Sequence, residues 1–444
     1  MLCLCWGPFR NGVWRLASST AWVLLGQGLP WLTALLAFPP LWAQLGSVRF
    51  GLLGLLWTFL AHAALLDLGL SRALTHRIAA LSAQARSEQI RPLLWSALGI
   101  ALLFGALGAC LGGMLAPWMV DLVRVSGPLR EEVCSALRLG LWSLPVLLAA
   151  GVLRAALEGI GRFAASALGR AIGNAGSMLL PCAVASLGFT RLSHLAGAVV
   201  LAWLGAALVQ VRWILRDFGP PGANVSLRVL GSELLQLAAY GGWASVSALL
   251  GPVFMYADRF ALAYFRGPAE VGAYVLVFEP LARFLVLAGS LSAVLIPLYS
   301  RSEGLREAHP LSVALLLGAL LLPWLAVAAV WGAPLLALWI GAKPQVPPIV
   351  FALLSWGVLA NSLGQIFFAV LYGLRRPRVV ALLHLAELPL YGAALFWFVP
   401  TWGIAGASAV WALRMSADAA CLSWLAYRSM RSKGMRIQLL RAAG

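Results

Sequence analysis

The sequence predicts an all-α membrane protein, and three observations lead to that fold class. The 444 residues are 62% hydrophobic and 11% charged, with a mean hydropathy of +0.90, whereas a soluble domain is roughly half apolar and about a quarter charged. Apolar stretches of about 20 residues, enough to cross about 30 Å of hydrocarbon, recur along the chain. These stretches are continuous rather than alternating, which favours helices over the short strands of a barrel.

Charged and proline-rich turns divide the chain into twelve expected transmembrane helices. In the first half these helices cover 16–38, 51–71, 92–115, 139–157, 164–188 and 194–215. In the second half they cover 236–263, 269–299, 310–333, 346–371, 379–399 and 403–427. We therefore expect two six-helix bundles, residues 1–220 and 221–444.

An internal repeat supports this division. The pattern A-x-L-x-G-x-x-R-x-x-x-x-A-L occurs at 155–168 and again at 369–382, an offset of 214 residues. Ala-Gly-Ala at 196–198 recurs at 405–407, an offset of 209. Both pairs fall in the fifth and sixth segments of their half, as expected for duplication of a six-helix unit, which is typical of transporters.

The net charge of +17 would suggest nucleic-acid binding in a soluble protein. Here 30 of the 32 basic residues are arginines scattered among the loops, as retention of positive loops in the cytoplasm produces. With the N-terminus inside, 22 of the 32 fall in cytoplasmic segments. We expect a bacterial inner-membrane protein with both termini in the cytoplasm and no nucleic-acid partner.

Motifs for catalysis and metal binding are missing from the sequence. The six cysteines form no C-x-x-C pair, which indicates neither a zinc site nor a disulfide framework. There is no phosphate-binding loop, which disfavours an ATP-driven pump. The sequence therefore predicts a protein that is not an enzyme and has no cofactor, with coupling to H+ or Na+ left open.

Several segments resemble polysaccharide-export flippases of the multidrug/oligosaccharidyl-lipid/polysaccharide exporter superfamily. They are R-F-G-L from Arg49, L-L-D-L-G-L-S-R-A-L from Leu65, E-G-I-G-R-F from Glu158, Y-A-D-R-F from Tyr256, P-A-E-V-G-A-Y from Pro268, I-P-L-Y-S-R from Ile296 and G-I-A-G-A-S-A-V-W-A-L-R from Gly403. The resemblance, which is of the O-antigen flippase type, spans nearly the whole chain.

The resemblance implies two bundles arranged as a V around a cavity that opens alternately to each membrane face. The implied cargo is a polyprenyl-diphosphate-linked oligosaccharide, and the implied partners are the lipid bilayer and polysaccharide assembly proteins. A cation-coupled multidrug exporter of the same superfamily is the first alternative, and a membrane glycosyltransferase or polymerase is the second. The charge of the cavity discriminates between the transporters, because cationic drugs favour carboxylates whereas diphosphates favour arginine.

Arginines within the helices are the candidate headgroup contacts, because a guanidinium donates two parallel hydrogen bonds to phosphate oxygens. Glu279 and Arg283, and again Arg414 and Asp418, lie four residues apart on one helical face. Each pair is either an ion pair that lowers the cost of burying charge or part of the site. The candidate substrate-binding residues are Arg283, Arg414, Arg259 and Arg72.

Carboxylates near these arginines are the candidates for gating or ion coupling. Asp67 and Asp258 occupy the family-like D-L-G-L and D-R-F segments near helix ends, where an interfacial salt bridge is the alternative reading. Glu387 is more isolated and either titrates during transport or pairs with a neighbouring helix. The candidates are Asp67, Asp258, Glu279, Glu387 and Asp418. His384 is expected to make a polar contact between helices.

Overall fold

The computed structural model describes residues 7–61, 70–84, 87–220, 250–251, 253–300, 305, 308–343 and 345–442. Every regular element in these ranges is a helix, which confirms the all-α prediction. The chain forms two compact units. Unit 1 is Met1–Gly46 with Leu56–Gly241, and unit 2 is Ser47–Leu55 with Gly242–Gly444. The domain limits expected at 220 and 221 stay a prediction.

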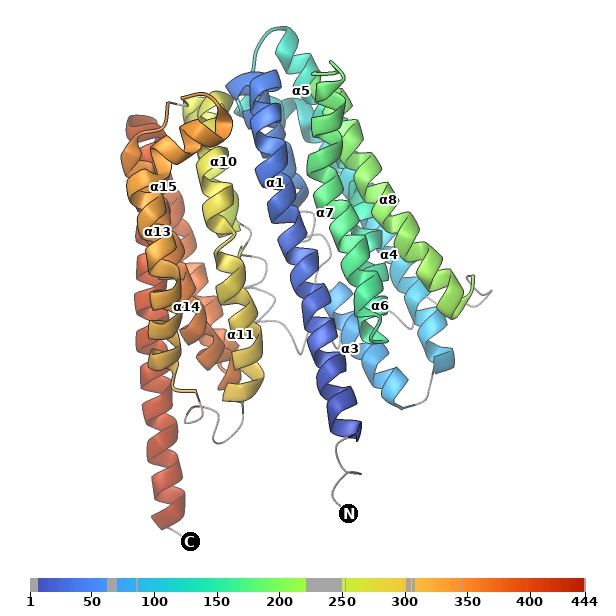
Figure 1. The fold of residues 1–444 in the computed structure, drawn as a ribbon, viewed down its shortest axis with the longest axis vertical. Helices are drawn as coiled ribbons and strands as arrows, with labels where there is room; N and C mark the ends of the chain where they lie inside the picture. Colours follow the sequence, from blue (N-terminus) through green and yellow to red (C-terminus); the bar gives the residue numbers. More distant parts are fainter. Residues whose placement is uncertain are drawn as a thin grey trace. The chain divides into compact units, whose positions relative to one another are not determined.

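The helices of unit 1 follow in chain order, and Figure 1 labels them. They are α1 Gly7–Ala61, α3 Leu70–Ala83, the short 3-10 helix η1 Ser87–Gln89, α4 Ile90–Leu122, α5 Pro128–Leu141, α6 Leu144–Gly159, α7 Phe163–Ser186 and α8 Leu192–Phe218. Gly46, where φ is 67°, divides α1 into two helical arms. The segment after this kink, Ser47–Leu55, belongs to unit 2.

Unit 2 also contains a helix over 253–266. Its other helices are α10 Pro268–Ala282, α11 Leu285–Tyr299, α13 Pro310–Ile340, α14 Pro348–Gly373 and α15 Pro377–Ala442. Four of these begin with proline, whose fixed φ suits the first turn and whose missing N–H is not needed there. The helix α15 has two arms that meet at Gly403, where φ is 51°.

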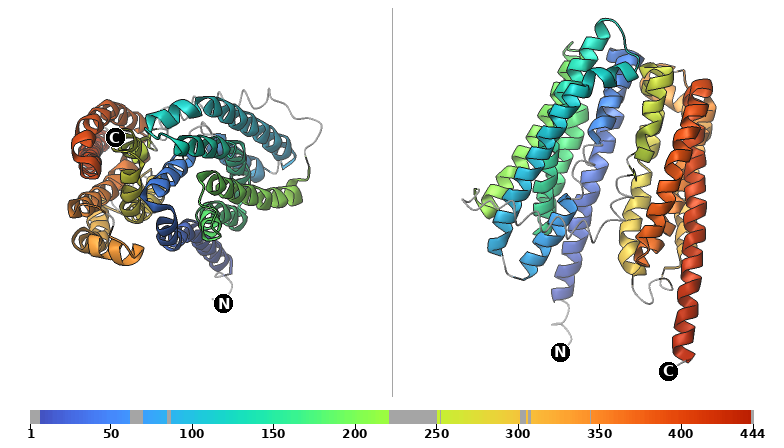
Figure 2. Two further views of the ribbon diagram at one scale, coloured as in Figure 1. Left: turned by 90° about the horizontal axis from the view of Figure 1, so that it is seen from above. Right: turned by 180° about the vertical axis from the view of Figure 1, so that it is seen from behind.

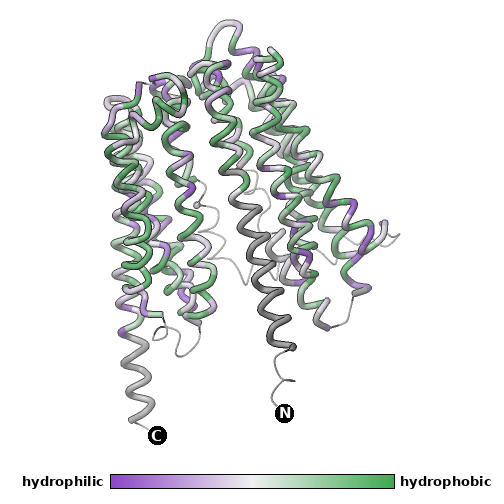
Figure 3. Tube along the Cα trace, viewed as in Figure 1, coloured by the Kyte–Doolittle hydropathy of each residue, from purple (hydrophilic) through white to green (hydrophobic). Residues whose placement is uncertain are grey.

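Within the described part of the chain, seven helices are long and apolar enough to cross a membrane, or eight if the bent pair α10 and α11 counts as one span. Large apolar side chains point outward from them, including Leu316 at 72% and Leu338 at 82% exposure. Figure 3 shows hydrophobic residues along most of the length of α13 and α14. Such a surface is stable only in lipid, so the chain is a multi-pass membrane protein. The count of twelve helices stays a prediction.

The helices expected at 379–399 and 403–427 are present as the two arms of α15, which meet at the non-helical residue Gly403. Two other expected elements differ in the structure. The span expected at 269–299 is bent by 41° between α10 and α11, where Pro280 removes a backbone donor from the helix. Part of the loop expected before residue 139 is helical, as α5.

Each unit is organised around one central helix. In unit 1, α6 packs against α3, α4, α7 and α8, and in unit 2, α14 packs against α10, α11, α13 and α15. Figure 2 shows α7 and α8 side by side. The repeat places α6 and the C-terminal part of α14 at equivalent positions, since 159 and 373 differ by the offset of 214. The two central helices are therefore the repeated elements.

The turns that follow these two helices share one hydrogen-bond pattern. After α6, the N–H of Arg162 donates to the carbonyl of Leu157 at 2.7 Å. After α14, the N–H of Arg376 donates to the carbonyl of Leu371 at 2.9 Å. In both turns the donor lies five residues after the acceptor. Such a bond caps the end of a helix when one residue of the turn has positive φ. That residue is Gly161 in the first turn (φ 77°) and Arg375 in the second (φ 58°).

Candidate functional site in unit 2

Unit 2 encloses ionisable side chains. Asp258 and Arg259 are 0% and 2% exposed, and His384, Glu387 and Asp418 are 8–9% exposed. They belong to two groups. The Asp258 cluster consists of Tyr256, Asp258, Arg259, Tyr274, Glu279 and Arg283. The Glu387 cluster consists of Phe254, His384, Glu387, Arg414 and Asp418.

Glu279 is the centre of the Asp258 cluster. Its Oε1 accepts a hydrogen bond from Nη2 of Arg259 at 2.7 Å, and its Oε2 accepts one from Nη2 of Arg283 at 3.1 Å. The pairing expected between Glu279 and Arg283 four residues later is therefore confirmed. One carboxylate holds two guanidinium groups from two helices, which joins the helix over 253–266 to the end of α10.

Asp258 and Arg259 are buried within unit 2, and the interfacial position considered for them stays a prediction. The carboxylate of Asp258 accepts a hydrogen bond from the Tyr274 hydroxyl in α10. The guanidinium of Arg259 lies 4.7 Å from the centre of the Tyr256 ring and 5.2 Å from that of Phe278. Ring faces attract a cation, so packing against these two rings offsets the cost of burying the Arg259 guanidinium. Sequence reasoning did not foresee this burial.

Arg283 differs from Arg259 in its access to the surroundings. It lies directly after the last residue of α10, at the bend before α11, and 27% of its side chain is exposed, against 2% for Arg259. Among the described residues its Nε is buried without a hydrogen-bond partner. Arg283 can keep its bond to Glu279 and present the exposed part of its side chain to an anion.

The Glu387 cluster joins the two arms of α15. Nε and Nη2 of Arg414 both donate to Oε2 of Glu387, at 3.1 and 2.9 Å. The Arg414 guanidinium lies 3.7 Å from the centre of the Phe254 ring. The ion pair considered for Arg414 and Asp418 is not formed, because Arg414 reaches across to the other arm. Glu387 is therefore not isolated but pairs with the neighbouring arm of α15, and its titration during transport stays a prediction.

Asp418 faces His384 instead, with 3.4 Å between Oδ1 and Nε2, in agreement with the polar contact expected for His384. The ring of His384 also contacts Phe254 edge-on, with centroids 5.8 Å apart. This cluster holds two carboxylates, one guanidinium and one imidazole. It is electrically neutral only when the imidazole or a carboxylate carries an additional proton or a cation is bound, so its chemistry suits proton or cation exchange.

One short helix connects the two clusters. Phe254 and Asp258 lie four residues apart on the helix over 253–266, which places both side chains on one face. Tyr391 of α15 contacts the ring of Phe254 with centroids 5.9 Å apart. A change in either cluster would therefore displace side chains on the same face of this helix.

The structure does not describe the side chains of the two remaining candidates. Asp67 lies outside the described residues, and Arg72 lies in α3 of unit 1 with a side chain that the structure does not describe. Within the described ranges no group of three or more His, Cys, Asp and Glu side chains is arranged to hold a metal ion.

Sequence reasoning missed Tyr274 and Phe254, although one signal for Tyr274 was present. The family-like segments Y-A-D-R-F and P-A-E-V-G-A-Y contain Asp258 and Tyr274, and the structure brings these two residues together. The second segment also contains Glu270, whose Oε2 accepts the N–H of Ile404 at 3.1 Å, next to the kink at Gly403. These two segments are contact points between helices.

Comparisons with known proteins agree with this picture. A family model described as polysaccharide biosynthesis protein matches residues 16–303. A protein of Shigella flexneri with the name "Putative O-antigen transporter" is 25% identical over 410 residues, which cover 92% of this chain and 96% of that protein.

Solved structures of transporters share the fold. An inward-facing multidrug resistance MATE family transporter of the MOP superfamily superimposes with a TM-score of 0.70 at 18% identity, covering 93% of this chain and 99% of the other. A MOP superfamily transporter from Pyrococcus furiosus, whose description reports a binding pocket of reverse polarity, gives a TM-score of 0.61 at 17% identity, with 94% and 96% covered. The chain thus has the fold of these transporters, and it belongs to the polysaccharide biosynthesis protein family.

Proposed function

We propose that this protein is a flippase that moves a polyprenyl-diphosphate-linked oligosaccharide from the cytoplasmic to the periplasmic leaflet. The observation that carries the proposal is the match to the Shigella flexneri relative along 92% of the chain, together with family membership. We place the protein in the bacterial inner membrane with both termini in the cytoplasm, as the arginine distribution favours. In this function it catalyses no covalent reaction.

The physical task is to carry a diphosphate and sugar hydroxyls past hydrocarbon, where unsolvated charge costs several kcal/mol or more. Arg283 is the best candidate for the headgroup contact, because 27% of its side chain is exposed, against 2% for Arg259 and 10% for Arg414. Arg259 and Arg414 are held by carboxylates and aromatic rings. We assign them the positioning of helices during alternating access.

The Glu387 cluster is the candidate for coupling to an ion gradient. Its two carboxylates exceed its one guanidinium, so a proton or Na+ that enters would complete the charge balance. Movement between the arms of α15 would change the distance between Arg414 and Glu387, and would thereby change the affinity for that ion.

Reconstitution in liposomes with a labelled polyprenyl-diphosphate sugar tests the proposal, with accessibility scored on each leaflet. Arg283→Gln is expected to slow transfer by about tenfold or more, because a hydrogen bond to a charged group contributes about 1.5–3 kcal/mol. The matched control is Arg266→Gln, since Arg266 also pairs with a glutamate four residues away, Glu270, but is 41% exposed. Equal transfer by Arg283→Gln and wild type, with both folded, would remove Arg283 from the site.

The same vesicles separate the proposal from its rival. The carboxylate excess of the Glu387 cluster favours a cation-coupled multidrug exporter as the second candidate. A pH or Na+ gradient should accelerate glycan transfer by the wild type and leave Glu387→Gln unaffected. Efflux of a cationic dye without glycan transfer would reverse the order of the two functions.

A further inference from the structure

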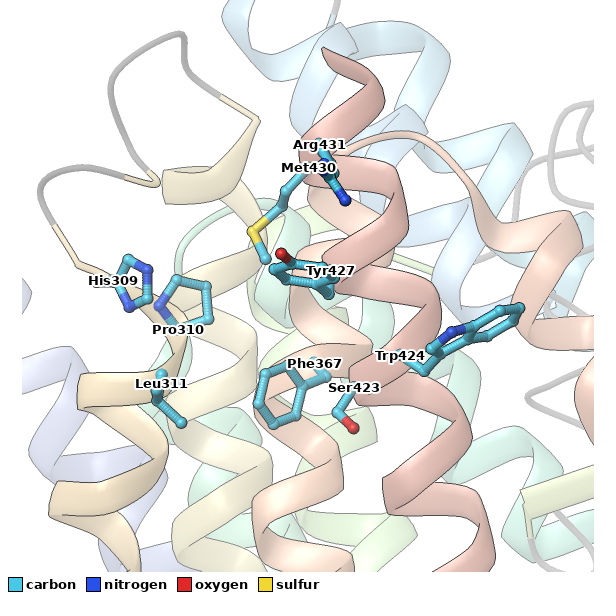
Figure 4. A pocket seen from close by; sticks show the side chains of 9 residues that line it. All are labelled: His309, Pro310, Leu311, Phe367, Ser423, Trp424, Tyr427, Met430 and Arg431. Atoms are coloured by element: carbon cyan, nitrogen blue, oxygen red, sulfur yellow. The ribbon is translucent and has the colours of Figure 1, made fainter. Parts of the chain in front are cut away.

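A pocket of about 660 Å³ opens on the surface of unit 2, formed by α13, α14 and α15. This volume is within the range of small-molecule sites, about 300–1,000 Å³. Figure 4 shows the side chains that line it, with Tyr427 and Met430 pointing toward Pro310 and His309. They are His309, Pro310, Leu311, Phe367, Ser423, Trp424, Tyr427, Met430 and Arg431. No residue of the Asp258 or Glu387 cluster is among them.

The pocket lies where the apolar spans end. Pro310 is the first residue of the candidate span of α13, and the sequence of α15 becomes polar and basic after Tyr427, with Arg428, Arg431 and Lys433. Phe367 precedes the end of α14 at Gly373 by six residues, which is about 9 Å along a helix. The pocket therefore extends from the hydrocarbon into the headgroup layer of one leaflet.

The side chains that line the pocket suit the boundary between hydrocarbon and headgroups. Leu311, Phe367 and Met430 provide an apolar portion, while His309 and Arg431 provide polar groups. Tyr427 and Trp424 are 61% and 58% exposed, and Tyr and Trp are the residues that favour the interface between lipid and water.

The basic side chains here have no acidic counterparts. Among the described residues, neither Arg428 nor Arg431 forms a salt bridge. The guanidinium of Arg428 lies 5.4 Å from the centre of the Trp424 ring, and Nη1 of Arg376 donates to Ser429 at 3.1 Å. After Asp418 the sequence contains no further acid, and the segment 301–309 has two Arg and two Glu. The pocket therefore carries excess positive charge.

We propose that this pocket binds an anionic phospholipid, with the phosphate at Arg431, which lines the pocket, and the first methylenes against Phe367 and Leu311. Arg428 lies outside the lining but stacks on the lining residue Trp424, and it adds positive charge beside the phosphate. Basic pockets between helices at the membrane surface bind anionic headgroups. A membrane lipid is favoured over a soluble anion because the apolar wall faces outward, with Leu311 at 54% exposure. The site is separate from the proposed flipping reaction.

Native mass spectrometry of the purified full-length protein, titrated with phosphatidylglycerol or phosphatidylcholine, tests the site. The wild type is expected to bind one phosphatidylglycerol more tightly than phosphatidylcholine, and R428Q with R431Q is expected to lose about fivefold in affinity for each arginine. The control is R212Q with R216Q in α8, where Arg216 also lies over a ring, that of Trp213, but belongs to unit 1, whereas the pocket is in unit 2.

A second variant distinguishes the pocket from a charged surface. Ser423→Phe keeps the charge and fills the pocket, so it should abolish the preferred binding. Equal affinity for the two lipids, or unchanged binding in Ser423→Phe, would overturn the proposal. Displacement of phosphatidylglycerol by equimolar undecaprenyl phosphate would also overturn it, because the pocket would then select the isoprenoid carrier.

Discussion

The two units share a packing plan but differ in what they enclose. In the described part of unit 1, the buried polar side chains are all neutral. They are Thr33, Thr58, Ser71, Ser96, Ser143, Ser166, Ser177 and Gln210. Unit 2 also encloses Asp258, Arg259, His384, Glu387 and Asp418. Helix packing alone does not require buried charge, since the described residues of unit 1 pack around α6 without it.

The difference in buried charge between the two units bears on which charged residues serve transport rather than packing. Burying an ion removes its hydration, which attraction to a partner repays only when the geometry is good. The ion pairs described in unit 1 are more exposed, such as Arg170 with Glu158, at 24% and 26%. We infer that the buried charges of unit 2 are retained for the transport step.

The largest expected effect comes from removing a shared carboxylate. Glu279→Leu would leave Arg259 and Arg283 without their acceptor, and we expect a loss of about 3–5 kcal/mol of stability. Glu158→Leu is the counterpart in unit 1, since Glu158 also accepts from two groups, Arg170 and Ser166, but is partly exposed. Its loss should be about 1 kcal/mol. Thermal unfolding in detergent measures both, and equal losses would contradict the comparison.

The shared packing plan predicts a second, intermediate effect. A Cβ on Gly373 would lie 2.6 Å from Cβ of Tyr299, and one on Gly159 would lie 2.8 Å from Cβ of Ile78. Gly373→Ala and Gly159→Ala should therefore each cost about 1–3 kcal/mol by overpacking. Gly113→Ala is the control, because its Cβ would meet nothing within 4 Å. A large loss in only one unit would indicate that the repeated helices are not equivalent.

The smallest effect concerns the repeated turn, where the αL position is Gly161 in one unit and Arg375 in the other. Arg375→Gly should stabilise unit 2 by about 1 kcal/mol, and Gly161→Arg should destabilise unit 1 by about 1 kcal/mol, because αL costs a side chain about that much. Opposite shifts of the melting temperature would show that the αL position has the same conformational requirement in both units. A loss of stability in Arg375→Gly would show that the Arg375 side chain makes a compensating contact.

The candidate site was partly predictable. The i,i+4 spacing of Glu279 and Arg283 was enough to predict their bond, because both ends lie on one helix. The same rule failed for Arg414, whose carboxylate partner is Glu387, 27 residues away on the other arm of α15. Spacing describes one helix, and it gives no information on which second helix offers a better acceptor.

The sequence by itself determined the all-α membrane fold, most helix positions and the repeat, because lipid requires long apolar helices and duplication copies local patterns. Only the tertiary structure decided which charges meet. Asp258 with Tyr274, and Arg414 with Glu387 and Phe254, depend on the kink at Gly403 and on the packing of α10. These distances arise from the crossing of separate helices, which no periodicity within one helix encodes.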